Sequence, residues 1–385
     1  MSVVPKTGLT GAILGLSFAV PAYLSRFIKT LLVATTLIFP AFPSFAVDPP
    51  LRALKADPTK TSVSGLSSGA AMAVQYEVAF SGSTLGIGVV AGVPYDCARV
   101  NFGGPVTCMQ GLPLEFPTLA SDYEAILASN SYAAAKIFEL EGKIDQTKNL
   151  ASHKVYLFSG KEDIVVKQTA MNAVYDFYKL AEVPQANLVY VNTFDAAHGF
   201  ISPTFGNLCF VTYWPFINEC MQEGKPYDQP WAILSHIYGQ LGAKAASLSA
   251  RPIAFDQREF APKDTGMDDT GYIYIPSSCQ NAAANTCKLH IVFHGCSQGA
   301  NVKHVDHDVF TKVGYNEWAD SNNIIVLYPQ LSDPTMGLLT FSGLNTTLSL
   351  PACWDWVGYT GPDFQIKTGK QLSAVRAMVA RLTGQ

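Results

Sequence analysis

Apolar and polar positions along the chain follow two alternating periods. Short runs of β-branched and aromatic residues predict buried strands at 60–65, 85–95, 153–160, 187–194, 271–276, 288–295 and 323–330. Segments with helical spacing are expected at 67–81, 166–181, 231–242, 308–322 and 369–382, and a helix with a loop is expected within 121–150. The repeated order of strand then helix predicts an α/β fold with a mostly parallel sheet covered on both faces. Residues 201–250 are irregular and aromatic before the helix near 231–242, and we expect a cap or insertion there.

The first 46 residues follow a different pattern. They contain three basic residues, no acidic residue and two apolar runs, at 11–24 and 31–46. Each run is shorter than the roughly 20 residues that span a bilayer. The second run ends in small residues at Ser44 and Ala46, as cleavage sites of signal peptides do. We therefore predict a signal peptide at 1–46, secretion to an extracellular or periplasmic space, and no stable membrane association after cleavage; a membrane anchor is the alternative.

Composition and charge narrow the classes of partner. The chain carries 26 Lys and Arg against 30 Asp and Glu, a formal net charge of −4, and three of the cations lie in the predicted signal peptide. A mildly acidic surface without a basic run argues against nucleic acid or anionic lipid as a partner. Because no low-complexity linker interrupts residues 47–385, we expect one domain there, and we expect a monomer.

All cysteines of the chain lie in residues 47–385, and their number is even. An even count behind a signal peptide predicts disulfides in an oxidising compartment. Proximity suggests three close pairs and one long-range pair: Cys97–Cys108, Cys209–Cys220, Cys279–Cys287 and Cys296–Cys353. A zinc site is the competing interpretation, but the chain has no C-x-x-C pair and no histidine at ligand spacing from a cysteine pair. We expect no metal and no cofactor.

A G-x-S-x-G pentapeptide at 65–69 is the first candidate for chemistry. Ser67 follows a predicted strand and opens a predicted helix, which is the setting of the nucleophile turn of α/β-hydrolases. In that turn the serine side chain stands at the carboxyl edge of the sheet, and the next backbone N–H, here that of Ser68, faces a developing oxyanion. The pentapeptide by itself also fits an ordinary flexible turn.

Two further residues complete a candidate catalytic triad. Asp163 follows the predicted strand at 153–160, and His198 follows the next strand, at 187–194. The chain order Ser67, Asp163, His198 is the order of nucleophile, acid and base in α/β-hydrolases, and ligand sites of open α/β sheets form at these strand ends. Two alternatives remain open here: Asp163 as the cap of the helix that follows it, and Asp195 as the acidic partner of His198.

The strand that supplies the oxyanion loop normally precedes the nucleophile, yet none precedes Ser67. A matching apolar strand occurs late, at 288–296, and ends in His294-Gly295-Cys296. This sequence is similar to the His-Gly oxyanion loop of esterases. The segment order is therefore the usual one, except that the strand with the oxyanion loop comes after the histidine instead of before the serine. This order predicts a circularly permuted α/β-hydrolase fold. Close chain termini make such a permutation physically tolerable.

Several spaced motifs together resemble one family. The segments "GLSSGA", "SGKEDIVV", "AAHGF", "VFHGCSQ" and "CWDWVGY" look like the catalytic domain of extracellular poly(3-hydroxybutyrate) depolymerases. The resemblance implies an α/β-hydrolase catalytic domain over 47–385 without a separate polymer-binding domain. It also implies Ser67 as nucleophile, Asp163 as acid, His198 as base and the N–H groups of Ser68 and Cys296 as oxyanion hole. His294 and Trp354 are expected at the substrate; a core position is the alternative for Trp354.

The expected activity is cleavage of a polyester or oligoester through an acyl-enzyme. A feruloyl, acetylxylan or general carboxylesterase is the nearest alternative, because the same triad serves any of these acyl groups. A secreted binding protein that has kept the hydrolase scaffold without its activity is the alternative from another class.

Overall fold

The computed structural model describes residues 48–111, 120–332, 337–341 and 346–385. The predicted signal peptide lies outside these residues, so its cleavage after Ala46 stays a prediction. Residues 47–385 form one compact unit.

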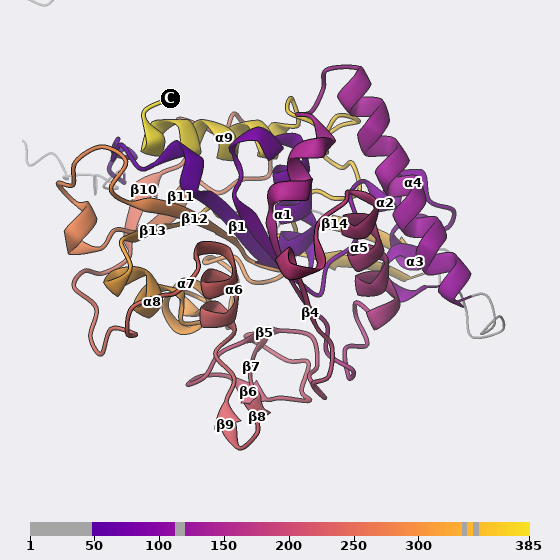
Figure 1. Cartoon of the computed structure of the whole chain (residues 1–385), viewed down its shortest axis with the longest axis horizontal. Helices are drawn as coiled ribbons and strands as arrows, with labels where there is room; N and C mark the ends of the chain where they lie inside the picture. Colours follow the sequence, from indigo (N-terminus) through magenta and orange to yellow (C-terminus); the bar gives the residue numbers. More distant parts are fainter. Residues whose placement is uncertain (1–47, 112–119, 333–336, 342–345) are drawn as a thin grey trace, which may run out of the picture. The chain divides into compact units, whose positions relative to one another are not determined.

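An eight-stranded sheet forms the centre of this unit, in the order β10-β11-β13-β12-β1-β2-β3-β4 (Figure 1). Its strands are β1 Thr61–Leu66, β2 Gly86–Val90, β3 Lys154–Phe158, β4 Leu188–Val191, β10 Ile253–Asp256, β11 Thr270–Tyr274, β12 Lys288–Phe293 and β13 Ile324–Tyr328. Neighbouring strands from β13 to β4 pair in parallel, whereas β10 and β11 pair antiparallel at one edge. The mostly parallel α/β sheet is therefore confirmed.

The late strand β12 lies directly beside the early strand β1. Val63 of β1 is in register with Ile291 of β12, and β13 follows on the other side of β12. The two ends of the domain also meet, because the Ala56 N–H donates to the Leu382 carbonyl at 3.0 Å. Spatial neighbours are thus kept although the chain begins elsewhere, which confirms the permuted order.

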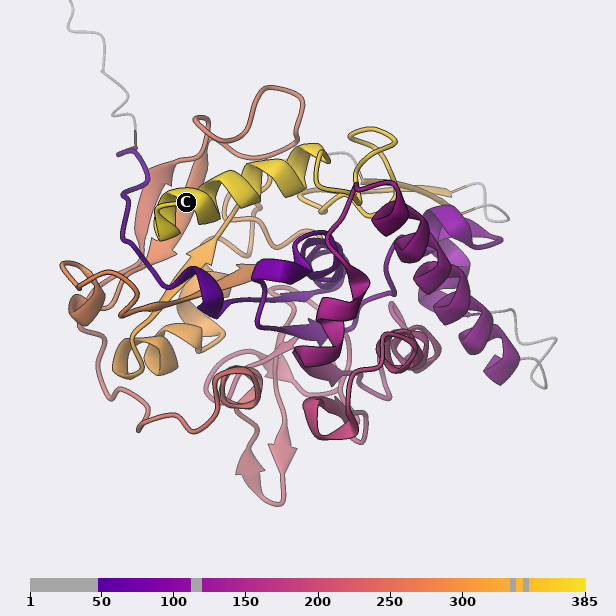
Figure 2. The same ribbon diagram turned by 45° about the horizontal axis from the view of Figure 1, so that its top comes forward.

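Helices cover both faces of the sheet. They are α1 Ser68–Ala79, α2 Cys97–Val100, α3 Gly104–Gln110, α4 Ala120–Leu140, α5 Gln168–Leu180, α6 Gln229–Tyr238, α7 Asp308–Lys312, α8 Tyr315–Ser321 and α9 Lys370–Thr383. Successive residues of β3 alternate between two hydrophobic clusters, one with α1 and α9 and the other with α6 and α8, which lie on opposite sides in Figure 2. In the ranges that the structure describes, no helix has the length and apolar character needed to cross a membrane.

Some elements differ from the sequence prediction. The helix expected at 308–322 is broken into α7 and α8 at Gly314, whose φ of 112° is incompatible with a continuous helix. The strand expected at 85–95 ends at Val90 because Ala91 adopts a φ of 50°. Strand β10 and the short helices α2 and α3 were not predicted.

The irregular segment after His198 forms small sheets outside the central one. Strands β5 Phe200–Ile201, β6 Asn207–Leu208 and β7 Ile217–Glu219 make one sheet, and β8 Met221–Gln222 pairs with β9 Lys225–Pro226. A further antiparallel pair joins β14 Gly337–Phe341 and β15 Thr346–Leu350. The expected insertion is thus present, at about 200–227.

The cysteines pair as expected from their proximity: Cys97–Cys108, Cys209–Cys220, Cys279–Cys287 and Cys296–Cys353.

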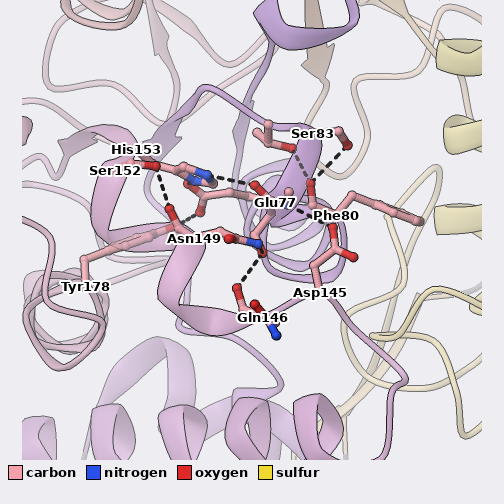
Figure 3. Close-up of polar contacts among 12 residues, drawn as sticks. Glu77, Phe80, Ser83, Asp145, Gln146, Asn149, Ser152, His153 and Tyr178 are labelled. Carbon is pink, nitrogen blue, oxygen red and sulfur yellow. Dashed lines mark hydrogen bonds and ion pairs between the residues drawn. The ribbon is translucent and has the colours of Figure 1, made fainter.

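A buried carboxylate anchors the far end of α1. Glu77 is completely buried, and Figure 3 shows His153 and Tyr178 converging on it from two other elements. His153 Nδ1 lies 2.8 Å from Glu77 Oε1, and the Tyr178 hydroxyl donates to Glu77 Oε2. A buried carboxylate requires such partners. Because α1 starts at the carboxyl edge of the sheet and runs back, this cluster stabilises the helix at the end opposite Ser67.

Candidate active site

Ser67 occupies a sharp turn between β1 and α1. Its φ of 59° and ψ of −121° are unusual for a residue with a side chain, as the nucleophile turn requires. The turn is held because the Ser67 N–H donates to the Val90 carbonyl and the Ser67 carbonyl accepts from Ala71, both at 3.0 Å. The strained backbone is therefore fixed on both sides of Ser67.

Both glycines of the pentapeptide are sterically required. A Cβ at Gly65 would overlap the backbone of Gly69, and a Cβ at Gly69 would overlap the carbonyl oxygens of Phe293 and His294 at the end of β12. Gly69 thus lets the Ser67 turn approach the strand that carries the predicted oxyanion loop. This close approach explains why the pentapeptide needs glycine at these two positions.

Asp163 and His198 form a buried pair at the ends of β3 and β4. His198 Nδ1 lies 2.8 Å from Asp163 Oδ2, and both side chains are less than one tenth exposed. Asp163 Oδ1 accepts hydrogen bonds from the N–H groups of Val165 and Val166, each at 2.8 Å. Since a carboxylate only accepts, the imidazole carries its proton on Nδ1, and Nε2 is left as a base. The alternative role considered for Asp163 was to cap the following helix. Its Oδ1 does accept backbone N–H groups of the following turn, so Asp163 both contacts His198 and stabilises that turn.

Asp195 does not compete for His198. Its side chain is three-quarters exposed and forms an ion pair with Lys161 at 3.1 Å. Its position in the turn before His198 explains its nearness in sequence. Sequence distance was therefore a poorer guide to the acidic partner than the position at a strand end.

A second serine–histidine contact lies inside the sheet. His290 Nδ1 is 2.6 Å from the Ser62 hydroxyl, and His290 Nε2 is 2.8 Å from the Ser64 hydroxyl. Burial lowers the pKa of His290 to about 3, so its ring is neutral at ordinary pH. All three side chains are fully buried and none lines the cavity that Ser67 borders, which makes this a structural network between β1 and β12.

The predicted oxyanion donors border the same space as Ser67. The Ser68 N–H belongs to the first turn of α1, where backbone amides have no acceptor within the helix. The N–H groups on either side of Cys296 are occupied: that of Gly295 donates to Gln298 Oε1 at 2.7 Å, and that of Ser297 to the Pro351 carbonyl at 2.7 Å. Among the described residues, the Cys296 N–H has no acceptor and is available to a ligand.

A cavity of about 530 Å³ brings these groups together. Ser67, Ser68, His198 and Cys296 line it, and Asp163 contacts His198 from outside the lining. The rest of the wall is largely apolar: Leu66, Ala71, Val93, Val106, Met109, Ile164, Val165, Val166, Phe216, Leu350 and Trp356. A volume of this size is typical of pockets that bind small organic molecules, roughly 300–1,000 Å³. Such a cavity accommodates an apolar acyl group next to the serine.

Two residues expected at the substrate lie elsewhere. Trp354 is completely buried and packs edge-to-face on Phe293, with its ring also against His294. His294 is 1% exposed, its Nδ1 lies 2.8 Å from the Gly295 carbonyl, and burial lowers its pKa to about 4. Neither side chain lines the cavity. Their contact with substrate therefore stays a prediction, and the core position weighed for Trp354 fits its burial.

Trp356 takes the place expected of Trp354. It lines the cavity two residues further along the chain, on a loop that Asp355 holds. The buried carboxylate of Asp355 accepts the N–H groups of Val357, Gly358 and Thr360 at 2.6–3.1 Å. The sequence analysis chose Trp354 of the "CWDW" segment, whereas Trp356 lines the cavity, because no regular strand or helix fixes which side chain faces it.

The side chain of Ser68 also links two parts of the site. Its hydroxyl accepts a hydrogen bond from the backbone N–H of Trp354 at 3.3 Å. Because Cys353 forms a disulfide with Cys296, this contact joins the serine turn to the loop on the other side of the cavity. The sequence analysis assigned a role only to the backbone of Ser68.

Comparison with known proteins gives a consistent set of relatives. No family model matches the chain. The poly(3-hydroxybutyrate) depolymerase of Delftia acidovorans is 39% identical over 336 residues, which cover 86% of this chain and 61% of that protein. The polyhydroxybutyrate depolymerase of Talaromyces funiculosus is 34% identical over 340 residues, which cover 86% of this chain and 92% of that protein. This chain therefore spans less than two thirds of the bacterial relative but most of the fungal one.

Solved structures agree with the sequence relatives. A PHB depolymerase from Penicillium funiculosum superposes with a TM-score of 0.73 at 34% identity, over 87% of this chain and 99% of that chain. A PHB depolymerase complexed with an R3HB trimer superposes with a TM-score of 0.72 over the same shares of the two chains, again at 34% identity. Both superpositions thus cover most of this chain and nearly all of the solved one.

Proposed function

This chain belongs to the poly(3-hydroxybutyrate) depolymerase family, and from that premise we propose that it is a secreted serine esterase that cleaves poly(3-hydroxybutyrate) or its oligomers. The observation that carries the proposal is the 2.8 Å contact between His198 Nδ1 and Asp163 Oδ2, with His198 and Ser67 lining one cavity. The four disulfides support an oxidising, extracellular or periplasmic location.

The proposed reaction has two steps. In the first, Ser67 Oγ attacks the ester carbonyl carbon while His198 Nε2 takes the hydroxyl proton. The N–H groups of Ser68 and Cys296 stabilise the negative oxygen, and His198 returns the proton to the departing alcohol. In the second step, water loses a proton to His198 and attacks the carbonyl carbon of the 3-hydroxyacyl-enzyme. The bond between the acyl group and Ser67 Oγ then breaks, His198 returns the proton to Ser67 Oγ, and the acid is released. Asp163 holds the imidazole in the tautomer that both steps need.

The apolar cavity supports a short aliphatic acyl chain as the bound portion. Val93, Met109 and Trp356 offer aliphatic and aromatic surface to the cavity that Ser67 also lines. An ester with a small branched acid therefore buries its carbon skeleton while its carbonyl meets the N–H donors. No Lys or Arg is among the described residues that line the cavity, so these residues offer no fixed positive charge to the carboxylate of an oligomeric product.

Exposed apolar side chains in the segment after His198 support contact with a solid polyester surface. Leu208, Phe210, Tyr213 and Met221 are all more than half exposed and lie in the segment that also carries Phe216 of the cavity wall. We expect the double variant Phe210→Ser/Tyr213→Ser to adsorb less to polymer granules and to keep its activity on soluble esters. Leu140→Ser on α4, also highly exposed, is the matched control and should leave adsorption unchanged.

A substrate panel on the purified protein tests the proposed function. It compares poly(3-hydroxybutyrate) granules, 3-hydroxybutyrate dimers and trimers, an aryl butyrate, and feruloyl and acetyl esters, each with the wild type and with Ser67→Ala. We expect turnover of the hydroxybutyrate esters and its loss in the variant. Turnover of feruloyl or acetyl esters alone would exclude the depolymerase assignment, and absence of turnover on every ester would favour a binding protein.

A further inference from the structure

Gln298 connects two separate walls of the cavity. Its side chain is 1% exposed, and its Oε1 accepts the Gly295 N–H at 2.7 Å. Its Nε2 donates to the carbonyls of Pro215 and Phe216, at 2.8 and 3.1 Å. The Gln298 N–H also donates to the Gly295 carbonyl at 3.2 Å, so Gly295 is held at both of its polar groups.

These bonds surround the backbone amide that the proposed mechanism uses. Gln298 occupies the N–H that precedes Cys296, and the Pro351 carbonyl occupies the N–H that follows it. The peptide between them is fixed from both sides, and its own N–H stays available. We propose that Gln298 is a positioning residue that aligns the Cys296 N–H with the oxyanion and holds the Phe216 wall at a constant distance from it. This inference rests on the proposed function.

The chemistry of the primary amide explains why glutamine occupies this position. Its oxygen accepts one backbone N–H and its nitrogen donates two hydrogens, which matches the three backbone groups that it meets. Methionine has nearly the same shape and offers none of these bonds. A small displacement of a catalytic group costs about 10²-fold in rate, as does the loss of one oxyanion donor.

A second buried glutamine provides a matched control. Gln257 is also completely buried, and its Oε1 accepts the Gln330 N–H at 3.0 Å. Its Nε2 donates to the carbonyls of Asp268 and Gln330, both at 2.8 Å. Gln257 therefore makes the same three kinds of bond, but neither it nor the partners of its side chain, Asp268 and Gln330, line the cavity.

The test compares Gln298→Met with Gln257→Met on a soluble aryl butyrate. For Gln298→Met we expect kcat to fall about 10²-fold with KM changed by less than about threefold, because the lost alignment acts on the transition state. For Gln257→Met we expect an unchanged kcat at a temperature where both variants are folded. Equal losses of kcat in the two variants, or a wild-type kcat in Gln298→Met, would overturn the inference.

A transition-state analogue gives a reading that does not depend on the amount of folded enzyme. An aliphatic trifluoromethyl ketone adds to a nucleophilic serine and places its oxyanion in the oxyanion hole, so its Ki should rise in Gln298→Met by the factor lost in kcat. An unchanged Ki would also overturn the inference. If the wild type hydrolyses esters no faster than Ser67→Ala, both the proposed function and this inference are wrong. If the wild type is active, Ser67→Ala is inactive and Gln298→Met behaves as wild type, only the inference is wrong.

Discussion

Asp163 uses its two carboxylate oxygens for two different tasks. Oδ2 lies 2.8 Å from His198 Nδ1, while Oδ1 accepts the N–H groups of Val165 and Val166. The turn that orients the carboxylate also supplies Val165 and Val166 to the cavity wall. The acid–base pair and the apolar pocket are therefore built from the same few residues.

Replacing Asp163 by Asn should lower kcat strongly and leave the fold intact. The amide keeps the shape of the side chain but favours the wrong tautomer of His198, an effect of about 10⁴-fold in serine hydrolases of this type. The measurement is the kcat for an aryl butyrate at pH 7. Asp195→Asn is the control, because Asp195 is exposed and pairs only with Lys161 in the described structure. Equal losses in the two variants would contradict the assignment of Asp163.

Trp356→Ala should weaken substrate binding, because it removes the largest aromatic side chain of the cavity wall. We expect a rise in KM for a hydroxybutyrate trimer, with a smaller effect on an aryl acetate that fills less of the cavity. Trp231→Ala is the matched control, since Trp231 is nearly half exposed on α6 and lies outside the cavity. An unchanged KM for the trimer in Trp356→Ala would show that the acyl chain binds elsewhere.

Much of this site could be predicted because its residues mark the ends of strands. Ser67, Asp163 and His198 follow β1, β3 and β4, and the hydrophobic pattern located those three strands to within a few residues. The late strand β12, which carries the proposed oxyanion loop, was recognisable for the same reason. Chemistry placed at the carboxyl edge of a parallel sheet is thus readable from strand order alone.

Other parts depend on contacts that no local pattern encodes. Trp356 lines the cavity, whereas Trp354 lies in the core. The loop between and after them is fixed because the Asp355 carboxylate accepts hydrogen bonds from the following backbone N–H groups. The break of the helix at Gly314 depends on a positive φ that glycine permits but does not demand. The bridge made by Gln298 joins segments about eighty residues apart, which a single sequence does not reveal.

Removing the buried carboxylate of Glu77 should destabilise the protein without changing the chemistry at Ser67. Glu77→Ala leaves His153 and Tyr178 buried without their shared partner, and breaking a buried pair in this way costs about 3–5 kcal/mol. Urea unfolding followed by circular dichroism measures the loss. Glu141→Ala, an exposed side chain, should leave the unfolding midpoint nearly unchanged. A Glu77→Ala protein as stable as wild type would refute the structural role.

Acid should weaken the fold through two buried histidines. Burial lowers the pKa of His290 to about 3 and that of His294 to about 4, whereas an unfolded histidine titrates near 6.5. Between pH 6.5 and 4 the unfolded state therefore binds more protons, and the free energy of unfolding falls by up to about 1.4 kcal/mol per pH unit for each histidine. Burial raises the pKa of Asp96 to about 6, so below pH 6 the folded state binds the extra proton at this residue. Its contribution to the free energy of unfolding therefore rises as the pH falls, opposite to that of the histidines.

Urea unfolding at pH 7 and pH 5 measures this dependence. We expect wild type to lose stability between the two values and His290→Gln to lose less, because one of the two depressed groups is gone. An equal loss in wild type and variant would show that His290 does not contribute.

The central claim is that Ser67 is the nucleophile, and active-site labelling tests it most directly. A fluorophosphonate transfers its phosphonyl group to an activated serine oxygen with loss of fluoride, and peptide mapping by mass spectrometry then locates the adduct. We predict a single adduct on Ser67, none in Ser67→Ala or His198→Ala, and a fall in ester hydrolysis of about 10⁴-fold or more in Ser67→Ala. An adduct on another serine, or ester hydrolysis that survives in Ser67→Ala, would contradict the claim.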